Sequence, residues 1–247
     1  RSSRGLGDVY KRQRKRVQED LTFGIRSVIE AIKQGKTINK ILLQKGLTGE
    51  LVKELLILVN KEKIIVQKVP IQKLNHMVKK NHQGVIAMIS PVAYHQIDWL
   101  VQEVYEKGED PFILILDRVK DVRNFGAIAR TAECFGVHAI VIPSKDSALI
   151  TNDSVKTSAG ALFKIPVCKV NSLTDAVDFL IGCGLKVFAC TEKSETLINK
   201  VKSSGPKVLI MGSEEDGVDH KLLKMKNFNF KIPMTGSIAS LNVSVAC

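Results

Sequence analysis

The stretches IPMTGSIASLNVSVAC (232–247) and DRVKDVRNFGAIARTAECFGV (117–137) decide the fold of this chain. Both follow apolar runs that are typical of buried strands, and both place small residues, amides and hydroxyls where a strand would give way to a helix. In open α/β sheets, ligands bind outside the carboxyl ends of the strands. The two stretches therefore predict two ligand-facing corners of one sheet.

Short apolar runs recur through the carboxyl-terminal half of the chain. They are FILIL (112–116), AIVIP (139–143), KIPVCKV (164–170), KVFAC (186–190), KVLIM (207–211) and FKIPM (230–234), and helical patterns separate them. Continuous apolar runs that alternate with helices are typical of a mainly parallel sheet covered on both faces. The sequence therefore predicts an α/β fold for residues 111–247.

The first corner combines an amide with a cationic side chain. We expect Asn124 in the turn after the strand and Arg130 on the helix that follows, with Gly126 and Ala127 on the same face as Arg130, where they clear space before its guanidinium. The same pattern also suits a surface Arg130 paired with Glu133 and an Asn124 that caps the helix. The buried stripe of this helix is predicted to be Val122, Phe125, Ala129, Ala132 and Phe135.

A second corner follows the run at 207–211. Gly212 ends that run, and its missing side chain would let a ligand touch the backbone. Ser213 and Asp216 have the spacing of a helix capping box, so an ordinary helix start is an equal alternative.

The third corner lies in residues 232–247. Ser240 is predicted as a helix N-cap and Asn242 falls in the first turn, where an amide is not needed for stability. Ile232 and Met234 are expected to form an apolar wall for a flat ring. An ordinary loop and cap is the alternative.

The amino-terminal part reads as a small α/β unit at residues 20–93. Helical spacing at 24–35 and 48–60 alternates with predicted strands at 39–45, 63–69 and 84–90, and residues 70–77 are a Pro-led turn or helix. Residues 94–110 are predicted to be a linker that contains a helix at 97–108. The fold class is thus a small α/β unit followed by a larger α/β domain.

The charge of the chain favours a polyanionic partner. Its 37 Lys and Arg against 25 Asp and Glu give +12, with a pI of 9.5, and this favours RNA or DNA over an acidic small molecule. A basic arm at residues 1–16 holds +6, and we interpret the other +6 as spread over the rest. We expect residues 1–13 to be foreign to the native domain.

Composition and motifs exclude several other classes of site. The five cysteines lack CxxC spacing, so we expect them to be reduced and buried, in a cytoplasmic protein without a metal site. No apolar stretch approaches the length of a membrane span. Neither G-x-x-x-x-G-K-[ST] nor a G-x-G-x-x-G after a strand occurs, and the histidines are scattered.

The three corners together resemble a known family. NFGAIARTAECFG, MGSEEDG and IPMTGSIASLNVSVA resemble motifs one, two and three of the SpoU/TrmH family, S-adenosylmethionine-dependent RNA ribose 2′-O-methyltransferases of the SPOUT class. The amino-terminal unit resembles the L30e-like RNA-binding domain of the bacterial 23S rRNA guanosine-2′-O-methyltransferases. The resemblance implies a SPOUT domain at 111–247 with a carboxyl-terminal trefoil knot, and a homodimer with its site near the subunit contact.

The resemblance also implies roles for individual residues. The catalytic set is Asn124, Arg130, Glu214, Ser240 and Asn242, and the residues that contact S-adenosyl-L-methionine are Gly212, Ile232, Met234 and Leu241. Two departures are visible, because Glu215 stands where the family usually has Gly, and the sequence stops at Cys247 inside the helix that motif three begins. We therefore expect a truncated carboxyl-terminal helix.

The implied substrate is structured RNA, and a guanosine of 23S rRNA is the leading candidate because of the amino-terminal unit. A tRNA substrate is an alternative within the same enzyme class. A noncatalytic RNA-binding or ribosome-assembly protein with the same fold is the alternative from another class, which the intact set of five catalytic residues disfavours.

Overall fold

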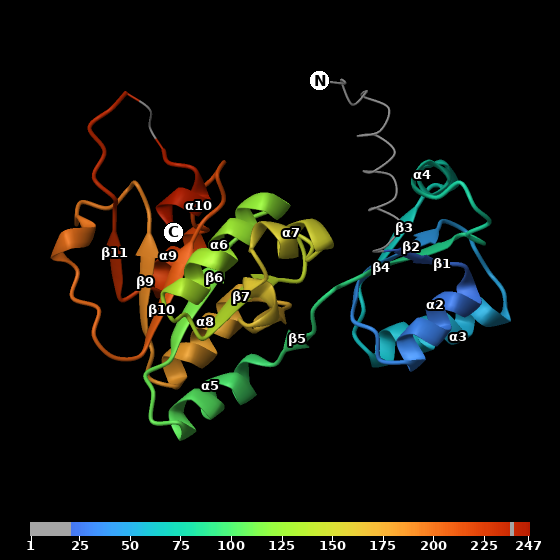
Figure 1. Ribbon diagram of the computed structural model, residues 1–247, viewed down its shortest axis with the longest axis horizontal. Coiled ribbons are helices and arrows are strands. Elements are labelled where there is room, and N and C mark those ends of the chain that lie inside the picture. The colour runs from blue at the N-terminus through green and yellow to red at the C-terminus, as the bar shows by residue number, and fades with distance from the viewer. Residues whose placement is uncertain (1–20, 238–239) are drawn as a thin grey trace, which may run out of the picture. The chain divides into compact units, whose positions relative to one another are not determined.

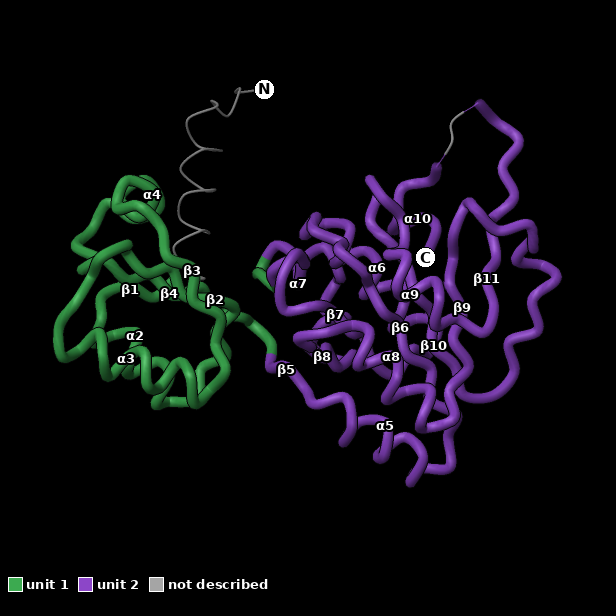
Figure 2. The backbone as a smooth tube through the Cα atoms, turned by 180° about the vertical axis from the view of Figure 1, so that it is seen from behind, with its two compact units in different colours: residues 1–92, 150–152 green, residues 93–149, 153–247 purple. Residues whose placement is uncertain are grey.

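The computed structural model describes residues 21–237 and 240–247 (Figure 1). The predicted basic arm at 1–16 lies outside the described residues. The described chain divides into two compact units: unit 1 runs to Val92 and includes Ile150–Asn152, and unit 2 holds Ala93–Leu149 and Asp153–Cys247 (Figure 2).

Unit 1 is a four-stranded sheet between two helical layers. The strand order is β1 (Leu21–Phe23), β4 (Val85–Ile89), β2 (Ile38–Gln44) and β3 (Val66–Val69), and only β2 and β3 are parallel. The helices α2 (Ile25–Lys33) and α3 (Glu50–Lys61) cover one face, and α4 (Ile71–Met77) lies on the other (Figure 1). Alternation along β2 explains this, because Ile41 and Leu43 pack with α2 and α3 while Leu42 packs with Leu74 of α4.

Unit 2 is built on a seven-stranded sheet in which every recorded pairing is parallel. The order is β11 (Phe228–Phe230), β9 (Lys186–Cys190), β10 (Lys207–Met211), β6 (Phe112–Leu116), β7 (Ala139–Pro143), β8 (Val167–Val170) and β5 (Tyr94–His95). This confirms the predicted α/β fold with a mainly parallel sheet. The chain leaves β6 toward β7 and β8 and later returns to place β10 on the other side of β6, so β6 and β10 flank the point where the strand order reverses.

Helices cover this sheet on both faces. The helices α5 (Ile97–Glu106), α8 (Leu173–Gly182) and α9 (His220–Met225) pack on one core that contains Ile113, Val187 and Ile210 of the strands. The helix α6 (Val122–Cys134) lies against α10 (Val243–Ala246) and the short 3-10 turn Ala161–Phe163, and α7 (Asn152–Thr157) approaches Gly126 of α6.

Three local expectations differ from the structure. The segment 94–110, expected as a linker that contains a helix, does contain the helix α5, but it belongs to unit 2, because it adds the edge strand β5 to the sheet and Leu100 of α5 is in the core. The strand expected at 230–234 ends at Phe230, because Pro233 has no N–H for a further ladder. Phe135, expected in the buried stripe, is 76% exposed, because α6 ends at Cys134 and Gly136 (φ 70°) turns the chain. The trefoil knot stays a prediction.

Candidate active site

The site lies at the carboxyl ends of β6 and β10. These strands pair in parallel with Leu116 opposite Met211, so the segments that follow them leave the sheet side by side. The first two corners predicted from the sequence are therefore neighbours, although they are about ninety residues apart in the chain. This is the edge at which parallel sheets bind ligands.

Asn124 lies in the first turn of α6, not in the preceding turn. The carboxylate of Asp121 caps the helix by accepting hydrogen bonds from the backbone N–H groups of Arg123 and Asn124, both at 2.8 Å. The sequence does contain a signal for this helix start. Asp is a preferred N-cap residue, and Asp121 stands directly before α6. The helix starts at Val122, and this start fixes the direction of the Asn124 side chain.

The segment after β10 forms a tight turn instead of a helix start. Ser213 and Gly217 exchange two backbone hydrogen bonds, and the Ser213 hydroxyl accepts from Asp216 N at 3.0 Å. The capping-box contact predicted between Ser213 and Asp216 therefore forms, but it closes a turn that carries Glu214 at its tip. The next helix, α9, begins later and is capped by Asp219.

Gly212 has a different role from the one expected. A Cβ built there would lie 2.0 Å from the carbonyl carbon of Gly217 and 2.1 Å from Val218 N. The returning backbone of the turn thus fills the space that we expected a ligand to use. Gly212 is required for the fold of the turn.

Asn242, rather than Ser240, is the N-cap of α10. Its Oδ1 accepts hydrogen bonds from Ser244 N at 2.9 Å and from the Ser244 hydroxyl at 2.6 Å. The amide nitrogen of the same side chain is thereby turned away from the helix. The cap fixes which end of the Asn242 amide faces the site.

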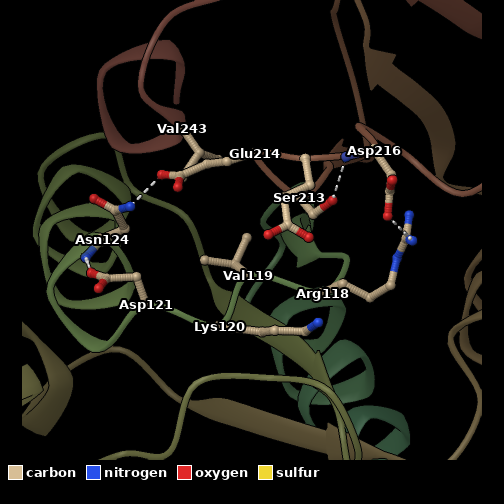
Figure 3. Close-up of a pocket in the computed structure, with 10 residues that line it drawn as sticks. Arg118, Val119, Lys120, Asp121, Asn124, Ser213, Glu214, Asp216 and Val243 are labelled. Atoms are coloured by element: carbon tan, nitrogen blue, oxygen red, sulfur yellow. Dashed lines mark hydrogen bonds and ion pairs between the residues drawn. The ribbon is translucent and has the colours of Figure 1, made fainter.

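Asn124, Glu214 and Asn242 meet in one hydrogen-bonded cluster (Figure 3 shows the first two). Glu214 Oε1 accepts from Asn124 Nδ2 and, at 3.2 Å, from Asn242 Nδ2. Asn242 Nδ2 also lies 3.2 Å from Asn124 Oδ1, which accepts from it. Three of the five residues predicted as catalytic are therefore in contact, and they come from three separate corners.

A clamp that sequence reasoning missed holds the turn that carries Glu214. Arg118 forms a bidentate pair with Asp117, at 3.1 and 3.2 Å, and donates to Asp216 Oδ2 at 3.0 Å and to Gly217 O at 3.1 Å. Asp117 is 3% exposed and also accepts from Asp219 N at 2.7 Å. The hydrogen-bonded carboxylate of Asp117 raises the pKa of Arg118, so the clamp keeps its charge.

A pocket of about 200 Å³ opens beside this cluster (Figure 3). Ten residues line it: Arg118, Val119, Lys120, Asp121, Asn124, Ser213, Glu214, Glu215, Asp216 and Val243. Four carboxylates against two cationic groups give the lining a net charge of −2. The pocket therefore suits a ligand with positive charge.

Arg130 does not join the cluster. It is exposed on α6, six residues beyond Asn124, which corresponds to about 9 Å along the helix axis and to a different face. Glu133, its possible partner, instead pairs with Lys164 at 3.2 Å. Gly126 does not clear space for a guanidinium, since a Cβ there would lie 2.6 Å from the Ser154 carbonyl of α7.

The remaining predicted residues lie outside the pocket. Ser240 is exposed just before α10, and Ile232 is partly buried after β11. Met234 and Leu241 are 39% and 41% exposed. Their proposed contact with a cofactor stays a prediction.

The described part of the chain was also searched for metal and membrane features. It contains no group of three or more His, Cys, Asp or Glu side chains arranged to hold a metal ion. None of its helices has the length and apolar character that crossing a membrane requires.

Comparison with known proteins identifies the family. Residues 111–247, which include all three corners, match the model of the SpoU rRNA Methylase family. The chain belongs to this family. Residues 21–95 match a second model, described as RNA 2′-O ribose methyltransferase substrate binding, and this range closely follows unit 1.

Members of the SpoU/TrmH family resemble the chain over nearly its whole length. A Bacillus subtilis (strain 168) protein provisionally named TrmH family tRNA/rRNA methyltransferase YacO is 34% identical over 93% of this chain and 92% of its own length. A similarly named protein of Staphylococcus aureus (strain MSSA476) is 35% identical over 93% of both chains.

Solved structures with the same fold include two that contain S-adenosylmethionine. The SpoU methyltransferase AviRb from Streptomyces viridochromogenes, in complex with AdoMet, has a TM-score of 0.56 at 21% identity over 94% of this chain and 88% of its own. The AdoMet-bound rRNA methyltransferase from Sinorhizobium meliloti has a TM-score of 0.57 at 22% identity over 100% and 94%. At these identities the likeness establishes the fold alone.

Proposed function

We propose that this SpoU family member transfers a methyl group from S-adenosyl-L-methionine to a ribose 2′-hydroxyl of structured RNA. The observation that carries the proposal is the cluster of Asn124, Glu214 and Asn242 at the carboxyl ends of β6 and β10. These residues come from three distant parts of the chain, and none of their mutual contacts is needed to form a helix or a strand. Such convergence is typical of a reactive site placed at a sheet edge.

The residues present fit the proposed cofactor in charge and chemistry. S-adenosylmethionine carries a sulfonium cation, and the pocket lining has a net charge of −2. We propose that Ile232, Met234 and Leu241, which lie outside this pocket, hold the rest of the cofactor, with the exposed apolar side chains of Met234 and Leu241 free to cover a flat ring. When bound, S-adenosylmethionine supplies an electrophilic methyl group.

The protein's own residues would position the reacting hydroxyl and stabilise its charge. Asn124 is held by Glu214 and Asn242, so its amide is preorganised to orient a ribose, and Ser240 lies close to the same corner in sequence. Arg130 is a donor without an accepting atom, which makes it a poor base. We therefore assign it to the developing alkoxide and the adjacent phosphate, with the proton leaving through that phosphate.

The position of Arg130 favours a homodimer as the active species. It lies about 9 Å along α6 from Asn124, and no hydrogen bond or ion pair of Arg130 is recorded among residues 21–237 and 240–247. In a homodimer, a second copy docked on α6 would place an interaction partner within reach of Arg130. All five cysteines are free, which agrees with a cytoplasmic site of action.

A guanosine of 23S rRNA is the substrate that we favour. The extra unit ahead of the SpoU domain matches the model described as RNA 2′-O ribose methyltransferase substrate binding, and a module of this kind suits RNA with extended structure. Transfer RNA is the second substrate class, because the relatives carry tRNA/rRNA in their names.

The test is methyl transfer from labelled S-adenosylmethionine to 23S rRNA transcripts and to tRNA. Arg130→Ala and Arg130→Lys are compared with Arg123→Ala, which removes the same exposed charge from the same helix. We expect label on ribose with the parent and with Arg123→Ala, and a loss of about 100-fold or more with Arg130→Ala. Arg130→Lys keeps the charge but not the fork, so near-parental activity would refute the positioning role.

The RNA that accepts label identifies the substrate class. Label on the rRNA alone supports the 23S assignment, and label on tRNA alone overturns it while keeping the reaction. A parent that binds RNA and transfers no label to either would instead support a noncatalytic RNA-binding protein.

A further inference from the structure

From the composition we expected the positive charge outside the basic arm to be spread over the chain. The structure shows that it is divided unevenly between the two units. Residues 21–92 of unit 1 contain twelve Lys and Arg against four Asp and Glu, a net charge of +8. Residues 93–247 contain eighteen of each and are neutral. Unit 2 as a whole therefore contributes no net attraction to a polyanion, and within the described residues this attraction comes from unit 1.

Charge is also divided between the two faces of unit 1. The four acidic residues all lie in or directly after the helices of one layer: Glu30 on α2, and Glu50, Glu54 and Glu62 on or at the end of α3. Two of them pair with lysines of that same layer, Lys33 with Glu54 at 2.9 Å and Lys53 with Glu50 at 3.0 Å. The α2–α3 layer thus partly neutralises itself.

The opposite layer carries lysines and no acids. Lys73 lies on α4, and Lys79 and Lys80 follow that helix; all three are exposed. Lys40 lies on β2 two residues before Leu42, so it points to the α4 side of the sheet, which Figure 1 shows opposite α2 and α3. No ion pair is recorded for any of these four lysines among the described residues.

Lys40 and Lys73 are close enough to influence each other. Partial burial lowers the pKa of Lys40, and the neighbouring charge of Lys73 lowers it further. Two ammonium groups that share a site without a carboxylate repel each other, and an anion between them would relieve this repulsion.

The loop that carries Lys79 and Lys80 is held in place. His82 is buried, its Nδ1 accepts from Gly84 N–H at 3.0 Å, and its Nε2 lies 2.8 Å from Asn75 Oδ1 on α4. Val78, between α4 and the two lysines, is 1% exposed. The lysines are therefore presented from a fixed backbone, which lowers the entropy cost of binding.

We propose that unit 1 holds the sugar–phosphate backbone of the RNA substrate on its α4 side, through Lys40, Lys73, Lys79 and Lys80. This rests on the proposed function for the choice of RNA as the polyanion. Lysines act as point charges toward phosphates, so the surface gives affinity and orientation, while base identity is read elsewhere. The α2–α3 layer faces away from the RNA.

The experiment compares two quadruple variants of the full chain that remove equal charge. The first is Lys40→Gln, Lys73→Gln, Lys79→Gln and Lys80→Gln, and the second, on the other layer, is Lys33→Gln, Lys36→Gln, Lys53→Gln and Lys61→Gln. Binding to a 23S rRNA transcript is measured as a function of salt concentration. We expect the first variant to bind about tenfold or more weakly, with a log–log salt slope smaller by about 3, and the second to keep its slope within about 1 unit.

A milder variant guards against misfolding, because Lys40 is partly buried. Lys79→Gln with Lys80→Gln changes two exposed side chains and is expected to lower the slope by about 1.5. Equal losses in the two quadruple variants, or an unchanged slope in the α4-side variants, would overturn the proposal.

Two further measurements, of cofactor binding and of methyl-transfer kinetics, test this proposal separately from the proposed function. S-adenosylmethionine binding and the rate at saturating RNA are expected to stay unchanged in the α4-side variants, while KM for RNA rises. If the parent transfers no methyl group but the α4-side variants alone lose RNA binding, the proposed reaction fails and the binding surface stands.

Discussion

The Arg118 clamp makes a quantitative prediction about stability. Arg118→Ala deletes four hydrogen bonds, two of them to Asp117, which is 3% exposed and keeps only the N–H of Asp219. Hydrogen bonds to buried charged groups contribute about 1.5–3 kcal/mol, whereas the exposed pair with Asp216 contributes at most about 1 kcal/mol. Because the Arg118 side chain is itself 29% exposed, we expect a loss of about 2–3 kcal/mol in the unfolding free energy.

The backbone of Arg118 supplies an internal control. Its φ is 58°, in the left-handed region that costs a residue with a Cβ about 1–2 kcal/mol. Arg118→Gly loses the same hydrogen bonds but relieves this strain, offset in part by the greater freedom of Gly in the unfolded chain. We therefore expect Arg118→Gly to be about 0.5–1 kcal/mol more stable than Arg118→Ala.

Urea unfolding followed by tryptophan fluorescence measures both differences. The chain has a single tryptophan, Trp99 on α5, so the signal reports on unit 2, which contains the clamp. A loss below about 1 kcal/mol for Arg118→Ala would refute the energetic reasoning. An Arg118→Gly variant no more stable than Arg118→Ala would refute the strain argument.

Four further outcomes are expected. Asn242→Asp keeps the cap of α10 but replaces a donor by a carboxylate beside Glu214, so methyl transfer should fall about tenfold or more, and Asn242→Ala, which also loses the cap, should lower both methyl transfer and thermal melting. Gly126→Ala should cost about 1–3 kcal/mol in thermal unfolding, because its Cβ would lie 2.6 Å from a carbonyl oxygen of α7, and Gly182→Ala, with nothing within 4 Å, should not. Burial raises the pKa of Cys168 to about 12, so thiol reagents at pH 8 should label the exposed Cys134 far faster. Because the native pKa of Cys168 is raised, the unfolding free energy should fall as pH rises from about 9 toward 12, and Cys168→Ala should flatten this fall.

The sheet of unit 2 was largely predictable from local pattern. The runs at 112–116, 139–143, 186–190 and 207–211 are short, apolar and bounded by turn residues, and each is a strand with those bounds. Such runs bury both faces of a parallel strand, so the signal is independent of distant contacts. The meeting of Asn124 with Glu214 and Asn242, in contrast, was implied by family resemblance and not by spacing.

The helix starts were less predictable, because two good caps compete at close range. Ser240 and Asn242 are both favoured N-cap residues, and local pattern cannot choose between them. Tertiary structure chooses Asn242, whose amide nitrogen reaches Glu214. The role of Arg118 was hidden for a similar reason, since its partner Asp216 is 98 residues away.

Averaging over the whole chain concealed the division of net charge between the two units. A charge of +6 outside the arm looks mildly basic over 231 residues. Division at Val92 separates a unit at +8 from one that is neutral. Counting charge by domain, once a boundary is predicted, would have found it.

The sequence separations within the cluster have a consequence for how the protein is made. Asn124 contacts partners 90 and 118 residues further along the chain, so translation must supply all three corners before the complete cluster can form. Unit 1, apart from residues 150–152, is synthesised first. During biosynthesis the chain therefore completes its basic unit 1 before the cluster of Asn124, Glu214 and Asn242 can form, so a nascent molecule carries the proposed RNA surface before the proposed catalytic site.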